Sequence, residues 1–272
     1  MKKVILTLSA ALYSLFATAQ PTHEFSINGG GGLSTLVYKI TSSKKNLGFG
    51  GEVGLGYTCV FGEMAGIHVG ADVSFYSVGA TLNGIKIVTE NLTDNEGDCF
   101  DLHTTLFDYK ESQNAMFLNV PVMAYFQTKT NHKFYAMAGV KIGIPLSCKY
   151  KASDFALTNE AYYPEYDNWL TNQTFAGYGR FENINSEGKQ KYRISAALSL
   201  ETGMKWNIAE VFAMYTGVYF DYGLNNLVKK DDQLFVNYDN AAPSAFIVNS
   251  ALAADKIHLM AVGVKVRLGF MK

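Results

Sequence analysis

Residues 258–270 read HLMAVGVKVRLGF, and their side chains alternate between two kinds along the whole stretch. One set is apolar apart from its leading histidine and consists of His258, Met260, Val262, Val264, Val266, Leu268 and Phe270. The other set contains small residues and two cations and consists of Leu259, Ala261, Gly263, Lys265, Arg267 and Gly269. Successive side chains of a β-strand point to opposite faces, so this period of two predicts a strand with one apolar and one polar face.

The same alternation recurs through the chain, whereas helical periodicity is almost absent. It predicts eight strands, at residues 25–38, 47–61, 66–80, 114–127, 133–147, 190–205, 211–225 and 256–270. These segments are longer than the usual strand of about 5–6 residues in a soluble protein. They are long enough to cross a bilayer, which takes about 9–11 residues in a tilted strand.

The connections between these strands differ systematically in length. Three are short, at 62–65, 128–132 and 206–210, and four are longer, at 39–46, 81–113, 148–189 and 226–255. Short turns at one end and long loops at the other are typical of outer-membrane barrels, in which the long loops face out of the cell. We therefore predict an all-β fold, a transmembrane up-and-down antiparallel barrel of eight strands with short periplasmic turns and long extracellular loops.

Two features predict that the apolar face contacts lipid and the polar face lines the lumen. The polar face is rich in glycine, which suits an eight-stranded barrel because its lumen is only wide enough for side chains to fill. Phenylalanines recur at the short-turn ends of the apolar face, as in an interfacial girdle: Phe25, Phe61, Phe126, Phe134, Phe212 and Phe270. In the segment 190–205 this orientation places Tyr192, Ile194 and Leu198 outside, and Arg193 and Glu201 inside.

The predicted lumen face carries nearly balanced charge. Its acids are Glu52, Asp72, Glu201 and Asp221, and its bases are Lys141, Arg193, Lys205, Lys265 and Arg267. A carboxylate held in a narrow lumen without a partner carries a large desolvation cost. Our hypothesis is an internal ion-pair network that plugs the lumen. The rival interpretation is that these charges face ordinary water on a soluble sheet.

The N-terminus has the layout of a secretory signal peptide. Two lysines precede an apolar stretch at 4–16, and Ala17 and Ala19 occupy the positions that a signal peptidase reads. We predict a cleaved signal peptide at 1–19, a barrel domain at 20–272 and a place in the bacterial outer membrane. The formal net charge of −1 gives no indication of nucleic-acid binding.

Several short motifs resemble the PorT-like outer-membrane β-barrel domain family, which comprises small eight-stranded barrels similar to OmpX and OmpA. Residues 117–125, FLNVPVMAY, resemble its fourth strand, residues 134–139 its fifth, and residues 221–227, DYGLNNL, the end of its seventh. Residues 263–270 resemble its closing strand, although Met271 and Lys272 follow the aromatic residue that usually ends the chain. The resemblance implies an eight-stranded barrel, and some members of the family act in protein secretion or gliding machinery.

No motif in the chain predicts an enzyme, a metal site or a cofactor. The glycine runs at 29–32 and 48–51 lack the lysine and hydroxyl residue of a phosphate-binding loop. The five histidines lack metal-ligand spacing. His68 and Asp72 both belong to the predicted lumen face, with one inward residue between them. A hydrogen-bonded core histidine is favoured there over a catalytic dyad. Cys99 and Cys148 both fall in predicted extracellular segments, and either a bridge between them or unpaired thiols is consistent with the sequence.

We expect a structural or surface-recognition role, with no open diffusion channel because eight strands leave none. The expected partners are outer-membrane lipid, the barrel assembly machinery during insertion, and an envelope protein bound through the extracellular loops. The aromatic-rich segment 148–189 is either such a recognition surface or a self-packed loop. Two alternatives remain: a lipid-modifying enzyme that uses Ser250, Asp255 and His258, and a soluble lipocalin-like carrier.

Overall fold

The computed structural model describes residues 21–38, 44–130, 133–228, 236–237, 246–250 and 256–272, so the predicted signal peptide lies outside the described residues. Eight long strands form the body of the molecule: β1 (Thr22–Tyr38), β2 (Lys44–Phe61), β3 (Ala65–Leu82), β6 (Tyr109–Gln127), β7 (Lys133–Tyr163), β10 (Ser195–Ala209), β11 (Phe212–Gly223) and β14 (Ile257–Met271). The shorter elements are β4 (Ile85–Thr93), β5 (Cys99–Phe107), β8 (Asn168–Leu170), the 3-10 turn η1 (Thr174–Ala176), β9 (Gly179–Lys189), β12 (Val236–Asn237) and β13 (Ile247–Val248).

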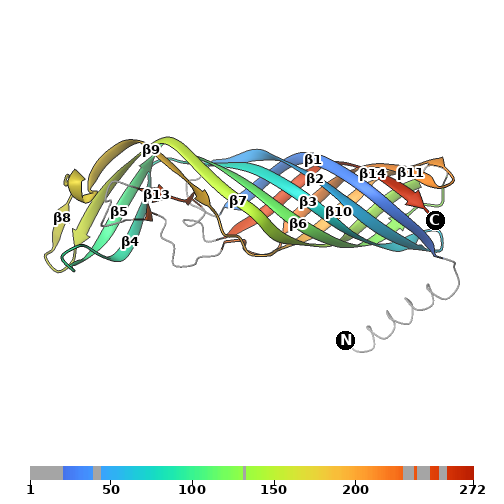
Figure 1. Cartoon of the computed structure of the whole chain (residues 1–272), viewed down its shortest axis with the longest axis horizontal. Helices are drawn as coiled ribbons and strands as arrows, with labels where there is room; N and C mark the ends of the chain where they lie inside the picture. The colour runs from blue at the N-terminus through green and yellow to red at the C-terminus, as the bar shows by residue number, and fades with distance from the viewer. Residues whose placement is uncertain (1–20, 39–43, 131–132, 229–235, 238–245, 251–255) are drawn as a thin grey trace, which may run out of the picture.

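Antiparallel pairing closes the eight long strands into a ring. Their order is β10-β11-β14-β1-β2-β3-β6-β7, and β7 pairs with β10 to join the two ends. Each of these strands therefore has a hydrogen-bonded neighbour on both sides, which removes the exposed edges of an open sheet. Figure 1 shows the resulting cylinder, with the start of β1 and the end of β14 at the same end. The predicted eight-stranded antiparallel barrel is confirmed.

The two faces of the barrel strands point as the sequence predicts. Val140, Leu198 and Val264 are 46%, 40% and 65% exposed, whereas Lys141 and Glu201 are each 4% exposed. A ring of apolar side chains on the outside of a barrel matches hydrocarbon, not water. The alternative of a soluble carrier with an apolar lumen is wrong, because charged side chains lie in the lumen and the apolar ones face outward.

Short turns and phenylalanines mark the periplasmic end. The intervals between β2 and β3, between β6 and β7, and between β10 and β11 are all short. Phe25 and Phe270 are cross-strand partners, and both are exposed. Phe126 and Phe134 are also exposed, and the rings of Phe212 and Phe270 lie 5.4 Å apart. These positions fit the predicted interfacial girdle.

The segments 81–113 and 148–189, predicted as loops, form mostly strand. β7 continues through the second segment to Tyr163 and is 31 residues long. β5, β8 and β9 each pair with β7, and β4 pairs with β5, so the sheet extends beyond the barrel (Figure 1). The physical reason is that the alternation resumes after register irregularities near Ser147 and Phe155, with its polarity reversed. Inward side chains such as Tyr150, Phe155 and Leu157 are now apolar and buried.

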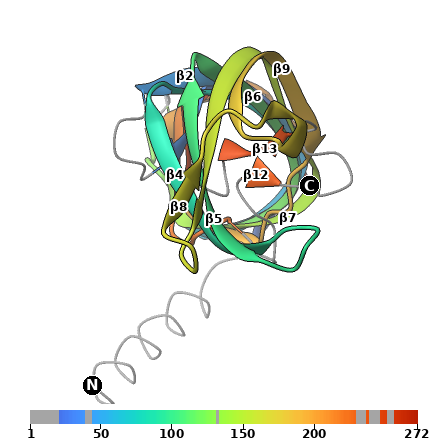
Figure 2. The same ribbon diagram turned by 90° about the vertical axis from the view of Figure 1, so that its left-hand side faces the viewer.

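This extracellular extension has a core of its own. The core consists of Leu82, Phe100, Leu102, Leu106, Tyr109, Ala152, Phe155, Leu157, Ala161, Tyr163, Tyr178, Val236, Phe246 and Val248. The last three come from the connection between β11 and β14, where β12 pairs with β13. Figure 2 shows this pair inside the ring of surrounding strands. The described part of the connection at 226–255, predicted as a long extracellular loop, therefore packs inside the extension and does not continue the barrel strands.

Candidate functional site

The periplasmic half of the lumen contains two charged groups of residues. Lys205 Nζ lies 2.9 Å from Glu24 Oε2, and the Tyr215 hydroxyl donates to the same oxygen at 2.7 Å. Arg267 donates from Nη2 to both carboxylate oxygens of Glu201, at 2.8 and 2.9 Å. All five side chains are buried, and charge-assisted bonds of this kind are the strong ones.

Further along the axis, two lysines connect three carboxylates. Lys265 Nζ lies 2.6 Å from Glu52 Oε1 and 3.4 Å from Glu201 Oε2. Lys141 Nζ lies 3.1 Å from Glu52 Oε2 and 2.6 Å from Asp221 Oδ2. The ion pairs therefore run without a break from Arg267 to Asp221 across the middle of the barrel. Because each ion touches at least one opposite charge, the cost of burying it is offset.

Asp72 and His68 lie in the lumen without contributing an ion pair among the described residues. Asp72 Oδ1 accepts a hydrogen bond from Asn28 Nδ2 at 3.0 Å. His68 Nδ1 lies 2.8 Å from the Thr58 hydroxyl oxygen. The structure thus gives His68 the role of a hydrogen-bonded core histidine, as the sequence favoured, with Thr58 as its partner.

Aromatic and aliphatic side chains fill the lumen above the ions. The Phe117 ring lies 6.0 Å from that of Tyr76 and 6.5 Å from that of Tyr192. Leu259 and Val228 are buried in the same cluster. At the next level the buried carboxylate of Glu111 accepts hydrogen bonds from the backbone N–H of Ser250 at 3.0 Å and from its hydroxyl at 2.7 Å. The described interior is therefore occupied from the ion pairs to the extension.

The distal end of the extension is acidic and aromatic. Residues 86–109 and 152–180 contain ten acidic residues and two cations, Lys86 and Arg180. The Phe175 ring is 85% exposed on η1, and Tyr166 and Trp169 are also exposed. Trp169 packs on Tyr162, with ring centroids 4.9 Å apart. Exposed aromatic rings of this kind are frequent on recognition surfaces.

Hydrogen bonds order the acidic turn beside these rings. Burial by itself would raise the pKa of the Asp94 carboxyl. The backbone N–H groups of Asp98 and Glu96 donate hydrogen bonds to this carboxylate, and together they hold its pKa below the ordinary value. The Tyr163 hydroxyl donates to the other oxygen of Asp94 at 3.0 Å. A hydrogen bond to the Asp98 carboxylate raises the pKa of Tyr166. A hollow of about 330 Å³ lies here, between Asp94 and Glu96 on one side and Phe175 on the other.

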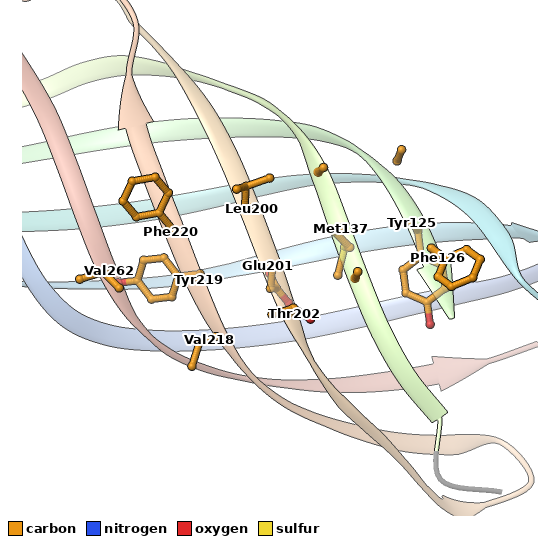
Figure 3. Close-up of a pocket in the computed structure, with 13 residues that line it drawn as sticks. Tyr125, Phe126, Met137, Leu200, Glu201, Thr202, Val218, Tyr219, Phe220 and Val262 are labelled. Atoms are coloured by element: carbon orange, nitrogen blue, oxygen red, sulfur yellow. The ribbon is translucent and has the colours of Figure 1, made fainter. Parts of the chain in front are cut away.

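A second hollow, of about 570 Å³, lies on the outer surface of the barrel (Figure 3). Its outward-facing wall is built from Ala124, Phe126, Ala136, Ala138, Leu200, Thr202, Val218, Phe220 and Val262. The charged residue in its lining, Glu201, is directed to Arg267 inside the barrel. This hollow therefore suits hydrocarbon and offers little to a polar substrate.

The family of this barrel follows from a comparison with known proteins. Residues 18–229 match the sequence model of the outer membrane protein beta-barrel domain. The chain belongs to this family. No curated protein matches the chain.

Three solved structures are among those that this family member resembles weakly. OprG from Pseudomonas aeruginosa is 12% identical with a TM-score of 0.39, over 93% of this chain and 98% of that one. Neisserial surface protein A is 11% identical with a TM-score of 0.35, over 89% and 95%. Ail, the attachment invasion locus protein of Yersinia pestis, is 12% identical with a TM-score of 0.31, over 92% and 99%. The family assignment itself rests on the sequence match.

The structure brings eight of the nine predicted lumen residues into the interior of this outer-membrane barrel. They are Glu52, Asp72, Lys141, Glu201, Lys205, Asp221, Lys265 and Arg267. Arg193 is the exception and a correction: it is exposed, and it precedes β10, which begins at Ser195. Tyr192, predicted to face outward, is instead buried and donates to Gln113 at 2.5 Å. The segment 190–194 is not part of β10, so the strand parity does not extend to these residues.

The sequence prediction omitted one member of the lumen set. Glu24 is 1% exposed and binds Lys205. The sequence contained a signal for this residue. Glu24, Ser26 and Asn28 are alternate residues of one strand, so they lie on the same face, and all three are buried. Including Glu24 and removing Arg193 gives five acids and four bases in place of four and five.

The residues weighed for enzyme chemistry do not assemble in the described part of the chain. Ser250 is buried against Glu111, and His258 lies half-buried on the outward-directed side of β14. Asp255 lies outside the described residues. Cys59, Cys99 and Cys148 are free, with Cys99 exposed and Cys148 buried, so the structure contains no Cys99–Cys148 bridge. Across the described ranges there is no acidic, histidine or cysteine cluster suited to a metal ion, and no helix long and apolar enough to cross a membrane.

Proposed function

We propose that this protein is a plugged, non-conducting barrel that holds a recognition sheet above the outer membrane. The observation that carries the proposal is the extracellular extension, which shares β7 with the barrel and has a separate apolar core. A pore would have no use for a packed extension ending in exposed aromatic rings. A binding protein needs this kind of rigid support for its contact residues.

The filled lumen supports the non-conducting part of the proposal. Lys141, Glu52 and Lys265 occupy the axis with direct ion pairs, and Phe117 and Tyr192 lie above them. Eight strands leave room only for such side chains. The expected result is that the purified protein adds no conductance to a planar lipid bilayer and does not accelerate sugar-driven swelling of liposomes. Stepwise channel openings at the level of a general porin would overturn this part.

The charge of the distal end supports a basic partner. Ten acidic residues against two cations, Lys86 and Arg180, create a net negative field, and exposed Trp and Tyr side chains are common anchors of recognition. We propose that the partner is a basic segment of another envelope or surface protein. The resemblance of 117–125 and 221–227 to PorT-like barrels supports membership in an envelope or secretion assembly. The protein acts by binding and not by catalysis, after export through a cleaved signal peptide and insertion by the barrel assembly machinery.

A defined probe tests this recognition. Proteoliposomes carrying the protein are titrated with a fluorescent oligolysine peptide and, as the matched control, with oligoglutamate. Oligolysine should bind, with an affinity that falls as salt is raised. Trp169→Ala with Phe175→Ala should weaken oligolysine binding, whereas Phe126→Ala at the periplasmic girdle should not. Equal binding of both peptides, or an unaffected double variant, would exclude the distal end as the site.

A further inference from the structure

A group of lysines lies where the lipid-facing surface ends, and neither the barrel nor the distal end accounts for it. Along β7 the outward residues Ile142, Ile144 and Leu146 are exposed and apolar. The next outward residues, Lys149 and Lys151, are exposed and cationic. The change from apolar to cationic side chains places these lysines at the level of the lipid headgroups on the extracellular side.

A third lysine faces this pair across the sheet. Lys149 of β7 and Lys189 of β9 are direct antiparallel partners. Lys151 is opposite Glu187, with 3.9 Å between Nζ and Oε2, and both side chains are largely exposed. Like charges directly opposite one another destabilise a sheet. A bound anion would remove this repulsion.

The three lysines line a groove. Its volume is about 420 Å³, and it is lined by Asn114, Lys149, Tyr150, Lys151, Glu187, Gly188 and Lys189. The adjoining hollow, of about 260 Å³, shares Asn114 and Lys149 with the groove and includes Phe75 and Met116. Phe75 is 51% exposed on the lipid-facing surface of β3. One continuous depression therefore has a cationic part above the hydrocarbon and an apolar part at its edge.

We propose that this depression, the β6–β7–β9 groove, binds the phosphorylated headgroup of a lipid in the outer leaflet. Lys149, Lys151 and Lys189 contact the phosphate, and Phe75 and Met116 contact the adjoining acyl chain. Three lysines and Glu187 give the groove a net charge of +2. A phosphate monoester carries about −1.5 to −2 at neutral pH, so the charges match. The site is separate from the proposed partner at the acidic distal end and does not depend on it.

Native mass spectrometry of the detergent-purified protein tests the proposal. The probes are phosphatidic acid, which bears a phosphate monoester, and diacylglycerol, which has the same acyl chains without phosphate. Phosphatidic acid should give a one-to-one adduct and diacylglycerol should not. Inorganic phosphate at the same concentration should compete poorly, because it lacks the acyl chain. Equal adducts with both lipids, or full competition by inorganic phosphate, would overturn the assignment to a phosphorylated lipid.

One substitution separates loss of binding from loss of folding. Lys189→Glu places opposite charges across the sheet from Lys149, so it should leave the barrel as stable as the parent or more so. Binding of phosphatidic acid should nevertheless fall by about tenfold or more, the loss expected when a charge-assisted contact is removed. Lys86→Glu makes the same charge change on exposed Lys86 of β4 and should leave binding unchanged. Parent-like binding by the Lys189→Glu protein, or an equal loss in both variants, would refute the site.

Discussion

The barrel and its extracellular extension are built from the same sheet, yet their interiors are opposite in character. The barrel interior is held by ion pairs such as those of Lys141, Glu52 and Lys265. The extension interior is apolar, with Phe155 and Leu157 at its centre. β7 passes through both regions and exchanges the polarity of its two faces between them. The comparison shows that the medium outside a strand decides what its inside contains: hydrocarbon outside leaves the polar face inside, and water outside leaves the apolar face inside.

The largest expected effect comes from unpairing a charge in the barrel interior. Glu201→Leu removes both hydrogen bonds that the buried Arg267 guanidinium donates to a carboxylate, and leaves it the weak bond to Met137 Sδ. Leaving such an ion without its partner costs about 3–5 kcal/mol. The free energy of unfolding in detergent, measured with guanidinium chloride and gel mobility, should fall by that amount. Arg193→Leu is the matched control, and its change should stay within about 0.5 kcal/mol because Arg193 is exposed. Similar losses in the two variants would contradict the lumen network.

A smaller and more local effect is expected in the extension. Leu157→Ala opens a cavity in the apolar core, and such changes cost about 2–5 kcal/mol. Limited proteolysis should therefore cleave the extension of this variant faster than that of the parent. The barrel should keep its heat-dependent gel mobility because its ion pairs are untouched. Val140→Ala, on the lipid-facing surface, should alter neither measurement; destabilisation of the barrel by Leu157→Ala would show that the two interiors form one unit.

The smallest expected effect concerns pH at the distal turn. The pKa of Asp94 is lowered in the folded protein, so its contribution to stability is present above the unfolded pKa of 3.8 and is lost as pH falls through the folded value. Because Asp94 is only partly buried, solvent weakens this contribution. The protection of the Glu96 and Asp98 amides, measured as the exchange rate relative to the intrinsic rate at each pH, should fall in strong acid. Asp94→Asn should show low protection already at neutral pH with little further change on acidification. Parent-like protection in this variant would show that the carboxylate does not order the turn.

Much of the barrel could be predicted because alternation within a strand is a local property. The stretch 258–270 alone separates Val264 and Val266 from Lys265 and Arg267, and the structure keeps that separation. Prediction failed where a strand begins or bends. Extending the alternation of β10 from Glu201 back to Arg193 places Arg193 in the lumen. This is wrong because β10 starts only at Ser195. In the same way, the sequence predicts a loop at 148–189, although β7 continues through Tyr163. The inner residues of this part of β7 are apolar and its outer ones polar, the reverse of the pattern before it, and register shifts near Phe155 interrupt the period of two.

The sequence by itself determined the closed barrel, the outward direction of its apolar side chains and the set of charges available to the lumen. Each of these follows from the two-residue period of a strand and from the rule that hydrocarbon excludes ions. Only the tertiary structure decided which ions meet, that Glu24 binds Lys205 from the far end of the chain, and that Val236, Phe246 and Val248 fill the extension. Those outcomes depend on cross-strand register and on bulges, which join residues distant in sequence and leave no periodic signal.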